Sequence, residues 1–219
     1  MTPRPIEIIG DPGSCHMGQL DLAIRLVSEG TEAGLDAVKF QLLTEAQLGG
    51  GNIKLDWQHL CEIRERFPCV RVFASVFNLE GVKFLLREDF REIKFPYSQW
   101  GLFCQCADYG WLSQFDLIYV STDVMRPPRK SNGSVPPVTW LYCIPHYPVQ
   151  YVVDFEGLFP RFHGFSDHTL GIEQTRRAVT AGARVIEKHF TVDSNRVQCP
   201  DHQFALRPER LRELCRTLR

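Results

Sequence analysis

The chain has 219 residues, an apolar fraction of 44%, a charged fraction of 23% and a formal net charge of -1. These values exclude disordered and fibrous classes, and the near-neutral charge gives no sign of the basic excess that a nucleic-acid or anionic membrane partner usually requires. No apolar run approaches the roughly 18 residues of a membrane span, and the opening segment lacks a signal peptide's apolar region. Eight cysteines are scattered without a CxxC pair, which is typical of reduced thiols. We therefore expect a cytoplasmic protein with no nucleic-acid or membrane partner.

Short β-rich runs alternate with amphipathic stretches along the whole chain. This alternation is typical of βα units that build a parallel sheet. We predict eight strands, at residues 6–10, 37–41, 71–75, 92–95, 117–121, 140–143, 164–166 and 184–189. The pattern predicts an α/β fold, a compact (β/α)8 TIM barrel that forms one domain over residues 1–219. A miscounted strand would leave an open doubly wound sheet as the alternative.

Amphipathic helices are predicted between most of these strands. The first covers residues 19–30, where Leu20, Ala23, Ile24 and Val27 share a face and Gly30 is expected to end the helix. Residues 175–183 and 209–218 have similar patterns. Residues 126–137 contain four prolines together with Asn, Gly and Ser, so we expect a proline-rich loop in place of the fifth helix.

Two histidines stand where the seventh and eighth predicted strands end. In a strand, residues two apart share a face, so Ser166 pairs with His168 and Glu187 with His189. Parallel barrels carry their functional groups at these strand ends. Isolated histidines often cap a helix or pair with an acid, but two on neighbouring strand ends favour a divalent transition metal, which neutral imidazole binds well.

Two lysines, Lys39 and Lys94, occupy otherwise apolar strands. A buried ammonium group normally needs an anionic partner, so the two lysines with Ser75 and Ser166 nearby predict a phosphate site. The alternative is that both side chains extend past apolar neighbours to solvent. The sequence leaves these two interpretations open.

These segments together resemble the N-acetylneuraminate (sialic acid) synthase family from about Ile6 to Leu218. The resemblance rests on His16-Met17-Gly18, on the segment 36–41, on Tyr147-Pro148, on the SDHT segment 166–169, on the EKHFT segment 187–191 and on Pro200-Asp201-His202. It implies a barrel that condenses phosphoenolpyruvate with an amino sugar and releases phosphate. A divalent metal, Mn or Mg, would polarise the sugar aldehyde.

The resemblance also implies roles for individual residues. His168 and His189 match the family's metal ligands. Catalytic positions are matched by Asp11, Glu187, Asp201 and Gln99, and substrate-binding positions by Lys39, Ser75, Lys94, Tyr97, Tyr147 and Ser166. The four lysine and serine positions are those that hold the phosphate of phosphoenolpyruvate, which agrees with the grouping made from the strands.

The chain departs from the family pattern at three of these sites and at one further position. Asp11 replaces a glutamate, Tyr97 a serine, Gln99 a glutamate, and Pro145 an asparagine or serine. Glutamine cannot act as a general acid or base. The sequence also ends after its eighth predicted helix without the family's antifreeze-like domain. We therefore expect either an acceptor other than N-acetylmannosamine or a lid from a separate protein, and a homodimer as a possible assembly.

Two alternatives to the synthase remain. One is a non-catalytic or regulatory barrel that keeps the phosphate and sugar site, as the change at Gln99 would allow. The other is a metal-dependent aldolase or sugar isomerase, which would follow if Lys39 and Lys94 faced solvent.

Overall fold

The structure is a computed structural model, in which residues 5–44, 54–124, 136–159, 161–192 and 199–219 are described. Eight parallel strands close into a barrel in sequence order, with β8 hydrogen-bonded to β1. The strands are β1 Glu7–Asp11, β2 Ala37–Leu42, β3 Arg71–Val76, β4 Glu92–Phe95, β5 Leu117–Thr122, β6 Val138–Cys143, β7 Gly164–Asp167 and β8 Val185–His189. All eight predicted strands and the α/β barrel class are confirmed.

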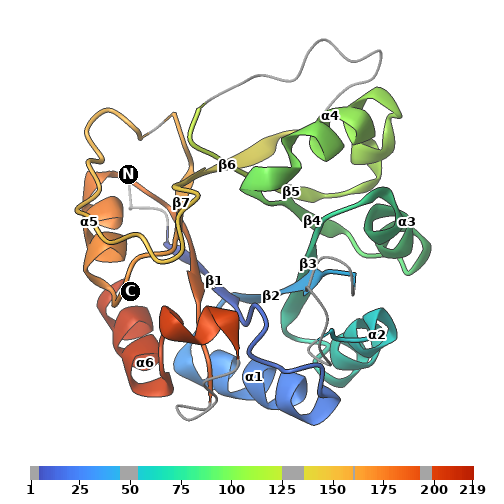
Figure 1. Ribbon diagram of the computed structural model, residues 1–219, viewed down its shortest axis with the longest axis horizontal. Helices are drawn as coiled ribbons and strands as arrows, with labels where there is room; N and C mark the ends of the chain where they lie inside the picture. Colours follow the sequence, from blue (N-terminus) through green and yellow to red (C-terminus); the bar gives the residue numbers. More distant parts are fainter. Residues whose placement is uncertain (1–4, 45–53, 125–135, 160, 193–198) are drawn as a thin grey trace.

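Helices surround this ring of strands (Figure 1). They are α1 Leu20–Ala33, α2 Trp57–Arg66, α3 Leu79–Arg87, α4 Trp100–Asp108, α5 Glu173–Ala181 and α6 Pro208–Thr217, with short 3-10 turns η2 Tyr97–Gln99, η3 Trp111–Gln114 and η4 Pro200–Gln203. The last helix, α6, packs beside α1, whereas in the described residues no helix lies between β5 and β6 or between β6 and β7 (Figure 1). Across the described ranges, no helix is long and apolar enough to cross a membrane.

Helix α1 differs from the prediction at its end. It continues through Gly30 and stops after Ala33, where Gly34 takes a left-handed conformation with φ of 103°. Gly30 is buried inside the helix against Leu35 and Phe190, and an ideal Cβ there would lie 2.8 Å from a Leu35 carbon. Gly30 was therefore wrongly predicted as the stop, because the packing of the helix on the barrel demands a small residue at that point.

The predicted proline-rich loop at residues 126–137 lies almost entirely outside the described residues. Only Pro136 and Pro137 are described there, and they precede β6 in an irregular conformation.

Strand alternation separates the barrel into two compartments. Side chains such as Val38, Phe40 and Ile93 point outward and join the large apolar core beneath the helices. Side chains of the opposite strand face point inward. They form a separate apolar layer inside the barrel, made by Ile9, Ala37, Phe73, Tyr119, Leu141 and Val185. This layer fills the middle of the barrel, so polar inward-facing residues are left at its two ends.

Candidate active site

A cavity of about 480 Å³ opens at the C-terminal ends of the strands. Every residue predicted for the site lines it except Gln99. The lining includes Asp11, Lys39, Ser75, Lys94, Tyr97, Tyr147, Ser166, His168, Glu187, His189 and Asp201. The folding of the barrel therefore brings residues from opposite ends of the sequence into one space.

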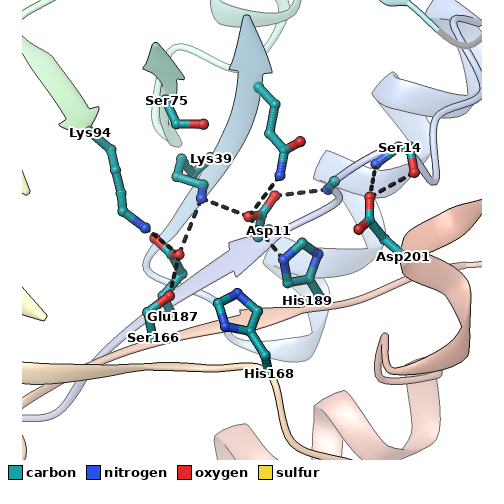
Figure 2. A network of polar contacts seen from close by, with 12 residues as sticks. Asp11, Ser14, Lys39, Ser75, Lys94, Ser166, His168, Glu187, His189 and Asp201 are labelled. Carbon is teal, nitrogen blue, oxygen red and sulfur yellow. Dashed lines mark hydrogen bonds and ion pairs between the residues drawn. The ribbon is translucent and has the colours of Figure 1, made fainter. Parts of the chain in front are cut away.

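Two lysines and two carboxylates form a buried ionic cluster in this cavity (Figure 2). Lys39 Nζ lies 2.6 Å from Asp11 Oδ2 and 3.2 Å from Glu187 Oε1, and Lys94 Nζ lies 2.5 Å from the same Glu187 oxygen. The Ser166 hydroxyl donates a third contact to Glu187 Oε1 at 2.8 Å. All four charged side chains are at most 3% exposed, so the alternative that the lysines reach solvent is wrong.

Burial and mutual attraction act against each other on these charges. Burial would raise the pKa of Glu187, but Lys39 and Lys94 hold that pKa well below its usual value. Burial would lower the pKa of Lys39, but Asp11 and Glu187 raise it above its usual value. For Lys94, burial and repulsion by Lys39 outweigh Glu187 and lower the pKa. Lys94 therefore releases its proton more readily than an exposed lysine does.

His168 and His189 stand next to each other at the cavity wall, with ring centroids 5.4 Å apart. Burial lowers the pKa of His168 well below its usual value, and the charge of His189 adds to this effect. His189 Nε2 lies 3.4 Å from Asp11 Oδ2, whereas His189 Nδ1 is buried without a hydrogen-bond partner. Aromatic rings of Tyr147 and Phe204 pack against the histidines.

These two imidazoles fit a divalent metal with most positions left open. Neutral imidazole is the form that binds a metal, and burial keeps His168 neutral. His189 Nδ1 is an unpaired buried nitrogen that a ligand could satisfy. Over the described ranges, no group of three or more His, Cys, Asp or Glu residues is arranged to hold a metal.

Asp201 reaches the cavity through a contact that sequence reasoning missed. Its Oδ2 atom accepts hydrogen bonds from the backbone nitrogen and the hydroxyl of Ser14, both at 2.6 Å. Gly13, with φ of +53°, leaves room here, since an ideal Cβ on it would lie 2.4 Å from Asp201 Oδ2 and 2.9 Å from His189 Nδ1. The turn signal Asp-Pro-Gly-Ser at 11–14 marks this loop in the sequence.

A second ion pair lies behind the histidines, on the outer face of the same strands. Lys188 Nζ is 3.1 Å from Asp167 Oδ2 and donates to the Thr169 carbonyl at 2.5 Å, with both charged side chains fully buried. Asp167 also accepts from the Thr169 nitrogen and from the Thr175 hydroxyl. This pair was not predicted from the sequence. Asp167 and Lys188 each stand between two inward-facing residues of their strand, so strand alternation directs both side chains to the outer face.

Two predicted site residues, Tyr97 and Gln99, follow β4, and only Tyr97 lines the cavity. Tyr97 lines it, and its hydroxyl donates to Asp123 Oδ2 at 3.1 Å. Gln99 is absent from the lining, and its side-chain nitrogen donates to Ser98 Oγ at 3.2 Å. Gln99, the last residue of η2 and a predicted catalytic residue, therefore lies outside the cavity lining, whereas Tyr97 and Ser98 of the same turn belong to it.

Individual known proteins match this chain over nearly its whole length, and a family model matches its C-terminal part. The model of the NeuB family matches residues 129–219. The N,N'-diacetyllegionaminic acid synthase of Campylobacter jejuni is 28% identical over 253 residues, covering 97% of this chain and 75% of the relative. Human N-acetylneuraminate-9-phosphate synthase is 25% identical over 259 residues, covering 99% and 70%. A solved N-acetylneuraminic acid synthetase from Leptospira borgpetersenii has a TM-score of 0.82 at 25% identity and covers 98% and 83%.

Proposed function

These matches confirm the resemblance to the N-acetylneuraminate synthase family, and on that premise we propose that the chain condenses phosphoenolpyruvate with an amino-sugar aldehyde. The products are a sialic-acid-like nonulosonic acid and phosphate. One observation carries the proposal: two buried ammonium groups and two imidazoles line a single cavity of about 480 Å³. Relatives with similar sequences include synthases of N,N'-diacetyllegionaminic acid, N-acetylneuraminate 9-phosphate and pseudaminic acid.

The two lysine ammonium groups are preorganised to bind a phosphate. Asp11 and Glu187 hold the two ammonium groups in the cavity, and the serine hydroxyls of Ser75 and Ser166 lie in the same lining. A phosphate that enters would share the ammonium groups with these carboxylates, and the charges need little reorganisation. Phosphate can then leave as an anion that remains stabilised.

Two groups are suited to move or orient protons. The condensation forms a bond between C3 of phosphoenolpyruvate and the aldehyde carbon, water adds at C2, and loss of phosphate gives the 2-keto acid. Glu187 is held deprotonated, and its Oε2 atom is buried with no partner, so it can orient the water. Lys94, with its lowered pKa, can give a proton to the departing phosphate.

His168 and His189 would hold the divalent metal, Mn or Mg. Such an ion supplies Lewis-acid polarisation of the aldehyde carbonyl when it is bound. The neutral His168 and the unpaired Nδ1 of His189 support this assignment. Asp201, fixed by Ser14 beside His189, would orient the hydroxyl groups of the acceptor.

The cytoplasm is the compartment that we propose. All eight cysteines are free thiols, which agrees with a reducing environment.

Phosphate release tests the proposed function directly. The protein would be incubated with Mn or Mg, phosphoenolpyruvate and a panel of amino sugars. We expect phosphate release that requires an acceptor, and the His168→Ala variant should lose it. Cys106→Ser, a change of a buried cysteine remote from the cavity lining, is the matched control and should retain activity. Calorimetric binding of phosphoenolpyruvate without turnover on any acceptor would instead favour the non-catalytic barrel.

A further inference from the structure

Cys15 and Cys199 lie side by side next to the site, although 184 positions separate them in the sequence. Their sulfur atoms are 3.4 Å apart, and each side chain is 4% exposed. Cys15 belongs to the turn that follows β1, and Cys199 directly precedes η4, which carries Asp201. The contact therefore joins the two loops that flank the cavity on this side.

Ser14 connects this cysteine pair to the cavity. Its hydroxyl lies 3.0 Å from the Cys199 sulfur and donates to Asp201 Oδ2 at 2.6 Å. Figure 2 shows Ser14 and Asp201 meeting beside His189. Asp201 lines the cavity, so these two contacts of Ser14 link the thiols to the cavity wall.

The two thiols differ in their readiness to ionise. The neighbouring Cys15 thiol, against the effect of burial, lowers the pKa of Cys199 to about 7. Contact with Cys199, together with burial, raises the pKa of Cys15 above its usual value. The thiolate is the nucleophilic form of cysteine, so Cys199 is the attacking sulfur and Cys15 the resolving one.

We propose that Cys15 and Cys199 form a reversible disulfide when the protein meets a hydroperoxide. The Cys199 thiolate attacks one peroxide oxygen, the O–O bond breaks, and after proton uptake the products are Cys199 sulfenic acid and water. The Cys15 sulfur then attacks the Cys199 sulfur and displaces a second water. Two thiols and one hydrogen peroxide thus give one disulfide and two waters, with the thiols oxidised and the peroxide reduced.

The bond changes the contacts of Asp201. A disulfide is about 2.05 Å long, so the sulfur atoms must approach from 3.4 Å. That approach changes the contact of Cys199 with the Ser14 hydroxyl, which also holds Asp201, and Asp201 follows Cys199 by two residues in the chain. If the proposed function holds, oxidation should raise the KM for the amino sugar at least fivefold. The KM for phosphoenolpyruvate should stay within about twofold, because Lys39 and Lys94 lie on β2 and β4, away from the two loops that carry the cysteines.

Peptide mapping of the oxidised protein tests the disulfide without any need for turnover. The full chain would be treated with hydrogen peroxide, its free thiols would be blocked, and the digested protein would be analysed by mass spectrometry. We expect a linked peptide that contains Cys15 and Cys199 and that dithiothreitol separates. The linked form should also unfold at a Tm higher by about 5 °C or more, because the bond closes a long loop. Thiols that stay reduced, or that oxidise at other positions, would overturn the proposal.

Single variants separate the two steps. Cys15→Ser should stop at the Cys199 sulfenic acid, which dimedone traps, whereas Cys199→Ser should give neither dimedone adduct nor linked peptide. Cys106→Ser, in which another buried thiol is changed, is the matched control and should still form the link. A dimedone adduct on Cys15 in the Cys199→Ser protein would contradict the assigned order of attack. A linked form whose KM values equal those of the reduced protein, in an active enzyme, would refute the effect on Asp201.

Discussion

The two ends of the barrel both carry ionic networks, but only one of these networks is complete. At the N-terminal end, Arg71 donates to Glu7 at 2.7 Å, to both carboxylate oxygens of Glu92 at 2.9 and 2.7 Å, and to the Tyr119 hydroxyl at 2.8 Å. At the C-terminal end, Glu187 Oε2, His189 Nδ1 and Ser121 Oγ are buried without partners. Among the described side chains, no unpaired buried atom belongs to the Arg71 network.

This difference assigns different tasks to the two ends. Unpaired buried polar atoms cost stability, and pairing with a ligand is one reason for a fold to retain them. The complete network at the N-terminal end ties β1, β3, β4 and β5 together and stabilises the closed barrel. The unpaired atoms at the C-terminal end are the ones that the proposed ligands would pair with. Variants at the two ends should therefore separate activity from stability.

The largest effect is expected from Lys94→Met. This change removes one of the two ammonium groups and leaves the Glu187 carboxylate with Lys39 and Ser166. We expect kcat/KM to fall on the order of 100- to 1,000-fold, since a preorganised charge beside the leaving phosphate is lost. Phosphate-release kinetics measure the effect, and circular dichroism shows whether the variant is folded. A folded variant with near-normal kcat/KM would contradict a role for Lys94.

The next effect is expected at the ion pair behind the histidines. Lys188→Met leaves the Asp167 carboxylate buried without its cation. Breaking a buried pair in this way costs about 3–5 kcal/mol of the free energy of unfolding. Urea denaturation measures this cost, and the double variant Lys188→Met with Asp167→Asn, which removes the charge but keeps an acceptor oxygen, should recover part of the loss. No recovery in the double variant would show that the charges are not coupled.

A smaller effect is expected at the N-terminal end. Arg71→Leu should lower the free energy of unfolding by about 1–2 kcal/mol, because Arg71 is 35% exposed and solvent screens its ion pairs. The value of kcat/KM should change less than about twofold, since the apolar layer separates Arg71 from the cavity. Urea denaturation and the phosphate-release assay on the same preparation check both values. A large loss of activity without a loss of stability would contradict a purely structural role for the N-terminal end of the barrel.

The smallest effect is expected at Gln99. Gln99→Ala should leave kcat/KM within about threefold of the natural protein, because the side chain does not line the cavity. The same assay measures it. A drop beyond tenfold would mean that Gln99 enters the site when substrate binds.

The sequence by itself determined the barrel and most of the membership of the cavity. Strand alternation is a local property, so the inward direction of Lys39, Lys94, Glu187 and His189 follows from their spacing. The SDHT and EKHFT segments, at the ends of β7 and β8, predicted that His168 and His189 are neighbours. Eleven of the twelve predicted site residues consequently line one cavity, and only Gln99 does not.

Only the tertiary structure decided the partners of these groups. Whether Lys39 and Lys94 face solvent or carboxylates depends on distances between strands that are far apart in sequence, as does the contact of Cys15 with Cys199. The end of α1 at Gly34 instead of Gly30 likewise depends on how closely the helix packs on the barrel. Periodicity fixes the direction of a side chain along its own strand, whereas pairing and charge balance arise from closure of the barrel.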